Sequence, residues 1–275
     1  WAFGLATSDN KSGPLYGLMD GGAAPQPNSN AGSGPALVED LWAVLSNDAT
    51  GNDDTDGIFI RVTQDDEGTN RMIVYLGGTD DFWGAGDQGI IENPFSELQI
   101  VKSDQKQAIQ DVLGYCAANS ACGSIDEIMI VGFSQGGMDA QNLAGVGGFA
   151  APITTIVTFG SPIIANPDAV TLHIQDNDDE VVKLEGFLKW VGDWNWVYRL
   201  FRPSLFSARD EAVEKDQIFR GDASTTHYVL DPLWNIHGDP KTYRELAATF
   251  DGLPASEFAA QRRSLERFLG GTLID

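Results

Sequence analysis

Residues 127–160 alternate between strand-like and helix-like segments, and this alternation restricts the folds open to the chain. Residues 127–133 (EIMIVGF) and 153–160 (ITTIVTFG) are short apolar runs rich in β-branched side chains, which is typical of strands. Residues 135–145 (QGGMDAQNLAG) between them predict a helix. A strand, a helix and a second strand in this order predict parallel strands joined by a crossover helix. The sequence therefore predicts an α/β fold.

Segments outside this unit extend the same pattern. Apolar residues recur at helical spacing in 36–47 (ALVEDLWAVLSN) and 103–118 (SDQKQAIQDVLGYCAA). Residues 58–64 and 71–78 predict two strands of a hairpin, because the turn-forming sequence DDEGTN lies between them. Residues 169–175 (AVTLHIQ) also alternate like a strand.

The length and composition favour one compact domain. The chain has 275 residues, of which 42% are hydrophobic and 21% charged, values close to those of ordinary globular proteins. Residues 1–36 are rich in Gly, Pro, Asn and Ser, which predicts an irregular N-terminal arm that wraps an edge. We expect a single domain over 1–275 with a mostly parallel central sheet flanked by helices.

The sequence Gly132-Phe133-Ser134-Gln135-Gly136 fits the pattern G-x-S-x-G between a predicted strand and a predicted helix. A sharp turn of this kind exposes the serine hydroxyl beside a base, and bulky neighbours would collide there. Ser134 is therefore the candidate nucleophile. The following helix would begin at Gln135, whose backbone N–H would then be available to an oxyanion.

A serine nucleophile needs a histidine base, and the chain has three: His173, His227 and His237. In hydrolases with such an elbow, the chain order is serine, acid, histidine. His173 comes too early and lies within a predicted strand, where a packed or surface imidazole is expected. His227 also lies in a strand-like segment, STTHYVLD. His237 falls in a loop before Asp239 and a proline, which predict the start of the last helix, and we prefer it to His227.

Two strands are predicted after the nucleophile helix, at 153–160 and 169–175. The acid is expected at the end of the second. The segment NDDEVVKL supplies several carboxylates there. We select Asp179, because the following VV suggests that the chain returns to the core, with Asp178 and Asp176 as alternatives. A buried carboxylate at this place would orient the imidazole and stabilise its charged form. The competing interpretations are a solvated acidic turn and a calcium loop.

The charge balance argues against a nucleic-acid partner. The chain has 40 acidic and 17 basic residues and a formal net charge of −23, whereas nucleic acids favour clustered Lys and Arg. The sequence contains no apolar run long enough for a transmembrane helix. Its start, WAFGLATSDN, has no basic segment followed by an apolar one, which is the expectation for a mature or trimmed chain.

The two cysteines, Cys116 and Cys122, lie six positions apart across a predicted helix end and a loop. A disulfide between them would suit a secreted protein. Two unpaired thiols are the alternative, and two cysteines alone do not complete a zinc site of the four-ligand kind.

Residues 186–206 (GFLKWVGDWNWVYRLFRPSLF) carry large apolar side chains on one helical face, and the opposite face is mainly basic. Such a helix can lie on a lipid surface and uncover a site when it moves. We therefore predict a lid or cap insertion over 186–220; the alternative is an ordinary half-buried helix. The candidate lid or substrate-binding residues are Trp190, Trp194, Tyr198 and Phe201.

Two further motifs are weaker. The acidic loop GNDDTDG places Asn52, Asp54, Asp56 and Gly57 in partial EF-hand order, but Thr63 stands where the bidentate glutamate is expected. A plain hairpin loop is therefore favoured over a calcium site. Ser161, in TFGSPI, lacks the flanking glycines of an elbow and is expected to be a packing or loop serine.

Four segments follow one another in the chain: VYLGGTDD, VGFSQGG, VTFGSPIIAN and NDDEVVKL. Together they resemble the class-three, fungal-type lipases of the α/β-hydrolase fold. In order, they are similar to that family's F-R-G-T strand end, its serine elbow, its TFGSPRVGN segment and its acid segment, D-x-V followed by proline. The resemblance spans roughly residues 71 to 243. This chain departs from the family where Gly77 occupies the arginine position and a valine replaces the usual proline after the acid.

The resemblance implies Ser134 as nucleophile, Asp179 as acid and His237 as base, with Thr79 and Gln135 as oxyanion-hole donors. We accordingly predict a serine hydrolase that acts on lipid esters, as a triacylglycerol lipase or a phospholipase of the A type. It would require no metal or organic cofactor. The alternatives are a carboxylesterase or feruloyl-type esterase acting on soluble esters, and a non-catalytic binding module on the same fold.

Overall fold

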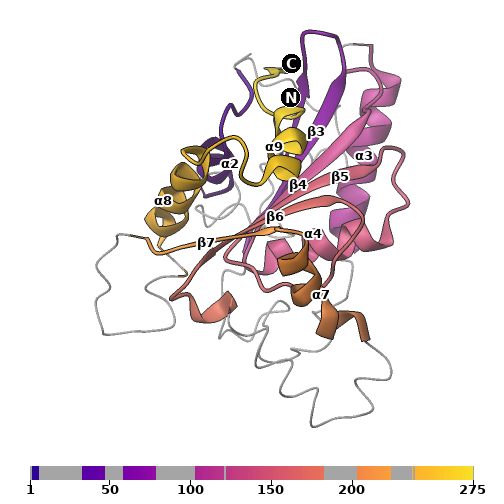
Figure 1. Cartoon of the computed structure of the whole chain (residues 1–275). Coiled ribbons are helices and arrows are strands. Elements are labelled where there is room, and N and C mark those ends of the chain that lie inside the picture. The colour runs from indigo at the N-terminus through magenta and orange to yellow at the C-terminus, as the bar shows by residue number, and fades with distance from the viewer. Residues whose placement is uncertain are drawn as a thin grey trace.

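The computed structural model describes residues 2–5, 33–46, 58–78, 103–120, 122–182, 203–223, 237 and 239–274. Over these residues the chain forms an eight-stranded mixed sheet in the order β1-β2-β3-β4-β5-β6-β7, with β8 beside β2 (Figure 1). Strands β3 to β7 run parallel, whereas β1 and β8 are antiparallel to β2 and β2 is antiparallel to β3. The strands are β1 (Ala2–Leu5), β2 (Ile58–Gln64), β3 (Asn70–Leu76), β4 (Glu127–Phe133), β5 (Ile153–Phe159), β6 (Val170–Asp176), β7 (Ile218–Gly221) and β8 (Thr272–Leu273).

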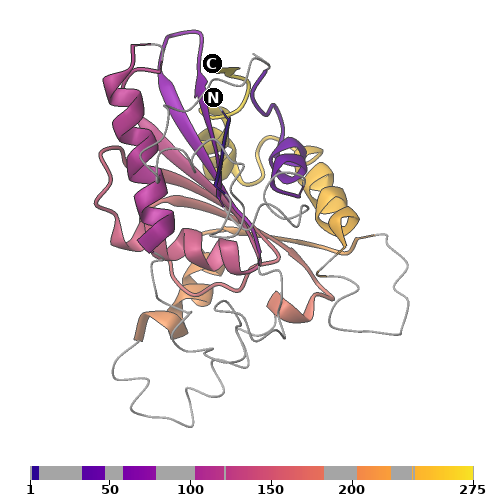
Figure 2. The ribbon, with the colours of Figure 1, turned by 180° about the vertical axis from the view of Figure 1, so that it is seen from behind.

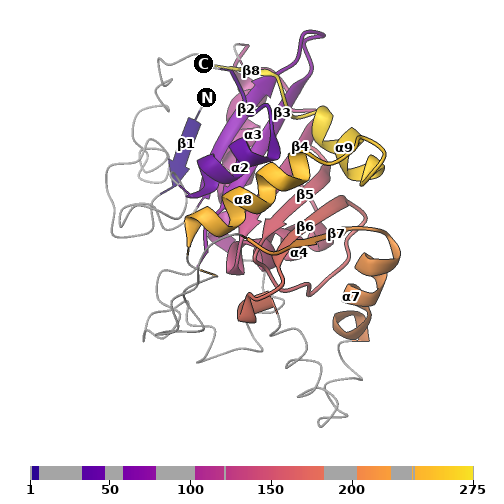
Figure 3. The ribbon, with the colours of Figure 1, turned by 60° about the vertical axis from the view of Figure 1, so that its left-hand side comes forward.

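Helices cover both faces of the sheet and give three layers. Helices α3 (Ser103–Ala118) and α4 (Gln135–Val146) lie on one face (Figure 2). Helices α2 (Val38–Val44), α8 (Pro240–Asp251) and α9 (Ala259–Glu266) lie on the other, with α2 and α8 side by side (Figure 3). Helix α7 (Pro203–Glu214) precedes β7.

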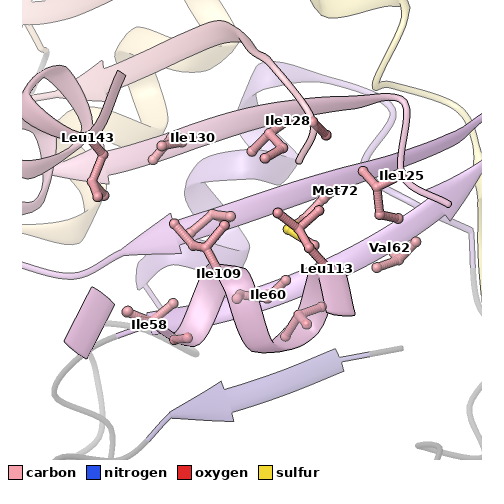
Figure 4. Packing of buried hydrophobic residues seen from close by; sticks show 14 of the residues in the cluster. Ile58, Ile60, Val62, Met72, Ile109, Leu113, Ile125, Ile128, Ile130 and Leu143 are labelled. Carbon is pink, nitrogen blue, oxygen red and sulfur yellow. The ribbon is translucent and has the colours of Figure 1, made fainter. Parts of the chain in front are cut away.

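Each face of the sheet has its own hydrophobic core. On the side of α3 and α4, alternate residues of β2, β3 and β4 pack against Ile109, Leu113 and Leu143 (Figure 4). On the other side, Leu41, Leu246 and Phe250 pack against the intervening residues of the same sheet. Both faces of β3 and β4 are buried, which explains why these parallel strands are continuous apolar runs rather than alternating ones.

The predicted segments compare closely with the structure. The strands expected at 58–64 and 127–133 and the helix expected at 103–118 have the predicted bounds. The strands expected at 58–64 and 71–78 correspond to β2 and β3, which form the expected hairpin. The helix expected over 36–47 is shorter, since α2 runs from Val38 to Val44. Residues 2–5 of the arm expected to be irregular form β1; the turn-forming residues that motivated the prediction lie later in that arm. Residues 186–202 of the predicted cap range lie outside the described residues, whereas the rest of the range forms α7 and the first residues of β7, which pairs with β6 in the sheet.

Cys116, in the last turn of α3, forms a disulfide with Cys122 in the following loop. Of the two alternatives that the sequence left open, the disulfide is therefore the one that forms, and it closes the loop that leads from α3 toward β4. Within the described part of the chain, no helix is both long and apolar enough to cross a membrane.

His173 is a packed histidine in the middle of β6, which is one of the two environments expected for it. Its side chain is buried, and its Nδ1 lies 2.8 Å from Thr158 Oγ1 on β5. Burial lowers the pKa of His173 to about 3. The imidazole is therefore neutral in the folded protein at pH values where an exposed histidine binds a proton.

We predict that this histidine lowers the free energy of unfolding as the pH falls. Below pH 6.5 the unfolded chain binds a proton at residue 173, whereas the folded chain does not until about pH 3, so acidification favours unfolding across that window. Between pH 7 and pH 5 the contribution is about 2 kcal/mol. Urea denaturation of His173→Gln should show a correspondingly smaller loss over this interval. An equal loss in both proteins would contradict the assignment.

Candidate active site

Ser134 lies in the sharp turn between β4 and α4. Its φ of 53° and ψ of −119° are uncommon for a residue with a side chain, and such backbone strain costs about 1–3 kcal/mol. Its backbone N–H donates to the carbonyl of Phe159 at 3.0 Å, so the adjacent strand β5 holds the turn. The serine of the G-x-S-x-G pattern is thus presented at the carboxyl end of a central parallel strand.

Three glycines make this turn sterically feasible. A Cβ atom on Gly132 would overlap the carbonyl oxygen of Gly136, and one on Gly136 would overlap the carbonyl oxygens at the end of β3. A Cβ on Gly137 would lie 2.5 Å from Ser161 Cβ. Ser161 is fully buried and fills this contact, which is the packing role expected for it. The glycines therefore allow α4 to approach the sheet closely.

The structure brings together the three residues that the sequence selected. His237 Nε2 lies 2.8 Å from Ser134 Oγ, and His237 Nδ1 lies 2.7 Å from Asp179 Oδ2. All three side chains are buried. The imidazole thus connects a hydroxyl to a carboxylate through its two nitrogens, the arrangement in which it can accept a proton from the hydroxyl while the carboxylate stabilises the resulting charge.

Two carboxylates at the end of β6 and in the loop after it, Asp176 and Asp179, have different roles. Asp179 accepts a hydrogen bond at Oδ1 from the backbone N–H of Val181 at 2.8 Å. Asp176 instead shapes the loop, because it accepts from the backbone N–H groups of Asp178 at 2.8 Å and Ala223 at 2.9 Å. Asp176 therefore ties the loop to the chain that leaves β7, and Asp179 is the carboxylate that reaches the histidine.

Tyr243 was not selected from the sequence, yet its hydroxyl donates to Asp179 Oδ2, the oxygen that also contacts His237. Burial, together with the negative charge of Asp179, raises the pKa of Tyr243 well above its usual value, so the hydroxyl remains a donor. Gly160 leaves room for it: a Cβ there would lie 2.6 Å from the hydroxyl oxygen. Within the amphipathic pattern of α8, Tyr243 resembles any core aromatic residue.

The start of α8 is held in place just after His237. Asp239 caps the helix by accepting from the backbone N–H of Lys241 at 2.9 Å, and Pro240 occupies the first turn, both as predicted. The indole N–H of Trp42 donates to the carbonyl of Pro240 at 2.7 Å. Asp251 at the other end of α8 accepts from the first backbone N–H groups of α2. Helix α2 is thus fastened to both ends of α8.

Some of the remaining candidate residues lie in the described part of the chain, and others lie outside it. Gln135 is the first residue of α4, as predicted. No cluster of His, Cys, Asp or Glu suited to a metal ion occurs among the described residues. Thr63, at the weak position of the calcium motif, is buried within β2. Several candidates lie outside the described residues: Thr79, His227, the loop 52–57, and the lid residues Trp190, Trp194, Tyr198 and Phe201.

No model of a known protein family matches the chain, and no curated protein matches its sequence.

Two glycines of α4 provide a test of the close approach. We predict that Gly136→Ala destabilises the protein by about 1–3 kcal/mol, because the new methyl group must displace the end of β3. Gly145→Ala in the same helix meets open space and should stabilise by about 0.5–1 kcal/mol. Urea denaturation measures both. Similar effects of the two substitutions would contradict the packing described.

Ser134 should be the serine that reacts with a fluorophosphonate probe, because it has the adjacent imidazole that can accept its proton. Labelling followed by peptide mass spectrometry should place the adduct on Ser134. Ser134→Ala should abolish it, while Ser161→Ala, which removes a buried hydroxyl in the neighbouring loop, should retain it. Labelling that survives Ser134→Ala would disprove the assignment.

Proposed function

We propose that the chain is a serine ester hydrolase with an α/β-hydrolase fold, and that lipid esters are its substrates. The observation that carries the proposal is the continuous hydrogen-bonded series from Ser134 through His237 to Asp179 at a strand-to-helix turn. The chain order serine, acid, histidine is also the order of that fold. The triad is recognised by its geometry and by the role open to each group rather than by sequence position.

In the acylation step, Ser134 Oγ attacks the ester carbonyl as His237 Nε2 takes the hydroxyl proton. Asp179 accepts the Nδ1–H hydrogen bond and stabilises the imidazolium without itself gaining the proton. The oxyanion receives hydrogen bonds from backbone N–H groups, for which we propose Gln135 at the start of α4 and Thr79. The proton on Nε2 then passes to the leaving alkoxide, and the acyl group remains on Ser134.

In the deacylation step, water attacks the acyl-enzyme. His237 Nε2 takes one water proton and returns a proton to Ser134 Oγ as the carboxylic acid leaves. The net reaction consumes one water and produces an alcohol and an acid, with no change in oxidation state. The residues proposed for the reaction therefore suffice without a metal or organic cofactor.

The proposal that the ester is a lipid rests on the sequence of residues 186–206. This aromatic, locally basic segment lies between the acid at 179 and the base at 237, where an insertion would stand near the site. Triacylglycerols and phospholipids cleaved at an acyl ester are the substrates that fit such a surface-seeking cap. The disulfide between Cys116 and Cys122 supports a place outside the cytoplasm, where such bonds persist.

Hydrolysis of p-nitrophenyl esters from acetyl to palmitoyl, with and without detergent micelles, tests this function. We predict that turnover rises with acyl length or with micelles. Ser134→Ala should lower kcat on the order of 10⁴-fold or more, because the nucleophile is lost.

The outcomes separate the alternatives. Activity confined to short soluble esters would replace the lipid substrate by a soluble one, as in a carboxylesterase. No Ser134-dependent activity on any ester would overturn the proposed chemistry and favour a binding module. Ser161→Ala is the matched control and should remain active.

A further inference from the structure

The imidazole of His237 is held on its flat face as well as at its two nitrogens. The ring of Phe133 stacks on it with centroids 4.8 Å apart and planes inclined by 22°. Phe133 is the residue before the nucleophile and the last residue of β4. The strand that presents the serine therefore also supplies a surface for its base.

The stacked ring is itself braced from behind. Trp42 meets Phe133 edge to face at 5.3 Å and 74°, and Tyr243 meets it at 5.8 Å and 63°. Trp42 also donates its indole N–H to the carbonyl of Pro240, three residues after the histidine. One side chain of α2 thus fixes both the stacking ring and the backbone that follows the imidazole.

We propose that Phe133 is a positioning residue that sets the plane of the His237 ring and stabilises its protonated form during ester hydrolysis. The inference rests on the proposed function, and it extends it to a residue that touches the base rather than the substrate. Rotation of the ring about its last side-chain bond would move both nitrogens away from Ser134 and Asp179, and the stacked face opposes that rotation. The negative face of an aromatic ring also attracts a cation.

Other titratable groups around the imidazole are few in the described part of the chain. Asp179 contacts Nδ1, and the Ser134 hydroxyl contacts Nε2. The Tyr243 hydroxyl acts through Asp179, and its ring meets the imidazole edge to face with centroids 6.5 Å apart. Asp176 hydrogen bonds to neighbouring backbone groups, and Asp239 caps α8. Exchanging Phe133 for an aliphatic residue leaves every one of these groups in place, so a change in proton binding can be traced to the lost ring face.

The experiment compares Phe133→Leu, Phe133→Tyr and wild type in the pH profile of kcat/KM on a soluble p-nitrophenyl ester. Phe133→Leu should lower kcat about tenfold and move the acid limb of the profile to lower pH by about 0.5 to 1 unit, because the imidazolium loses its aromatic partner. Phe133→Tyr keeps the ring face and should retain the wild-type profile. Phe133→Met replaces Phe133→Leu if the latter does not fold.

Two variants of the same aromatic cluster serve as references. Phe159→Leu removes a ring that packs on Trp42 and Tyr243, so it should lower stability without moving the acid limb. Tyr243→Phe removes a donor to Asp179, which strengthens the carboxylate as a partner for the imidazolium and should move the limb to higher pH. The shifts predicted for Phe133→Leu and Tyr243→Phe have opposite signs, which a general loosening of the site would not produce.

Histidine NMR separates failure of this inference from failure of the proposed function. With three histidines in the chain, the His237 signal is assigned by its loss in His237→Gln. Its titration midpoint should move in Phe133→Leu in the direction given above, whether or not any ester is hydrolysed. An unchanged midpoint and an unchanged acid limb would overturn the role of Phe133, whereas absent turnover with a shifted midpoint would overturn only the function.

Discussion

The contact between the first turn of α4 and the ends of the central strands is the constraint on which the rest of the structure depends. Gly136 and Gly137 bring this turn against the carbonyls that end β3 and against Ser161. The helix can then start directly after β4, and the residue at the junction is forced into a positive φ. A larger side chain at either glycine would lift the helix and release the corner. The other parts of the site are arranged around this corner.

Burying the carboxylate of Asp179 is costly unless donors surround it. Three donors do so: the backbone N–H of Val181, the imidazole of His237 and the hydroxyl of Tyr243. Two of these come from the segment around α8, far along the chain. The acid and the base therefore stabilise each other, and a site that lost its C-terminal part would leave a buried charge with one donor.

The sequence predicted whatever depends on local patterns, namely the parallel unit around Ser134, the hairpin and the cap of α8. The helix expected to be the last is followed by α9. It selected His237 and Asp179 but kept His227, Asp176 and Asp178 as alternatives, because only the folded chain shows which carboxylate reaches the imidazole. It did not reveal the contacts of Phe133 and Tyr243 with His237 and Asp179. Those aromatic residues follow ordinary core periodicity, and their partners lie more than 60 positions away in the chain. Tertiary contacts of this kind leave no mark on the segments that make them.

The pairing of α2 with α8 has a consequence for biosynthesis. Val38 and Asp251, which join the two helices, are 213 positions apart. The apolar sheet face beneath them therefore stays uncovered on the ribosome until the chain has been made as far as residue 251. Contacts between such distant segments also form slowly. The nascent chain must be kept from aggregating during this interval.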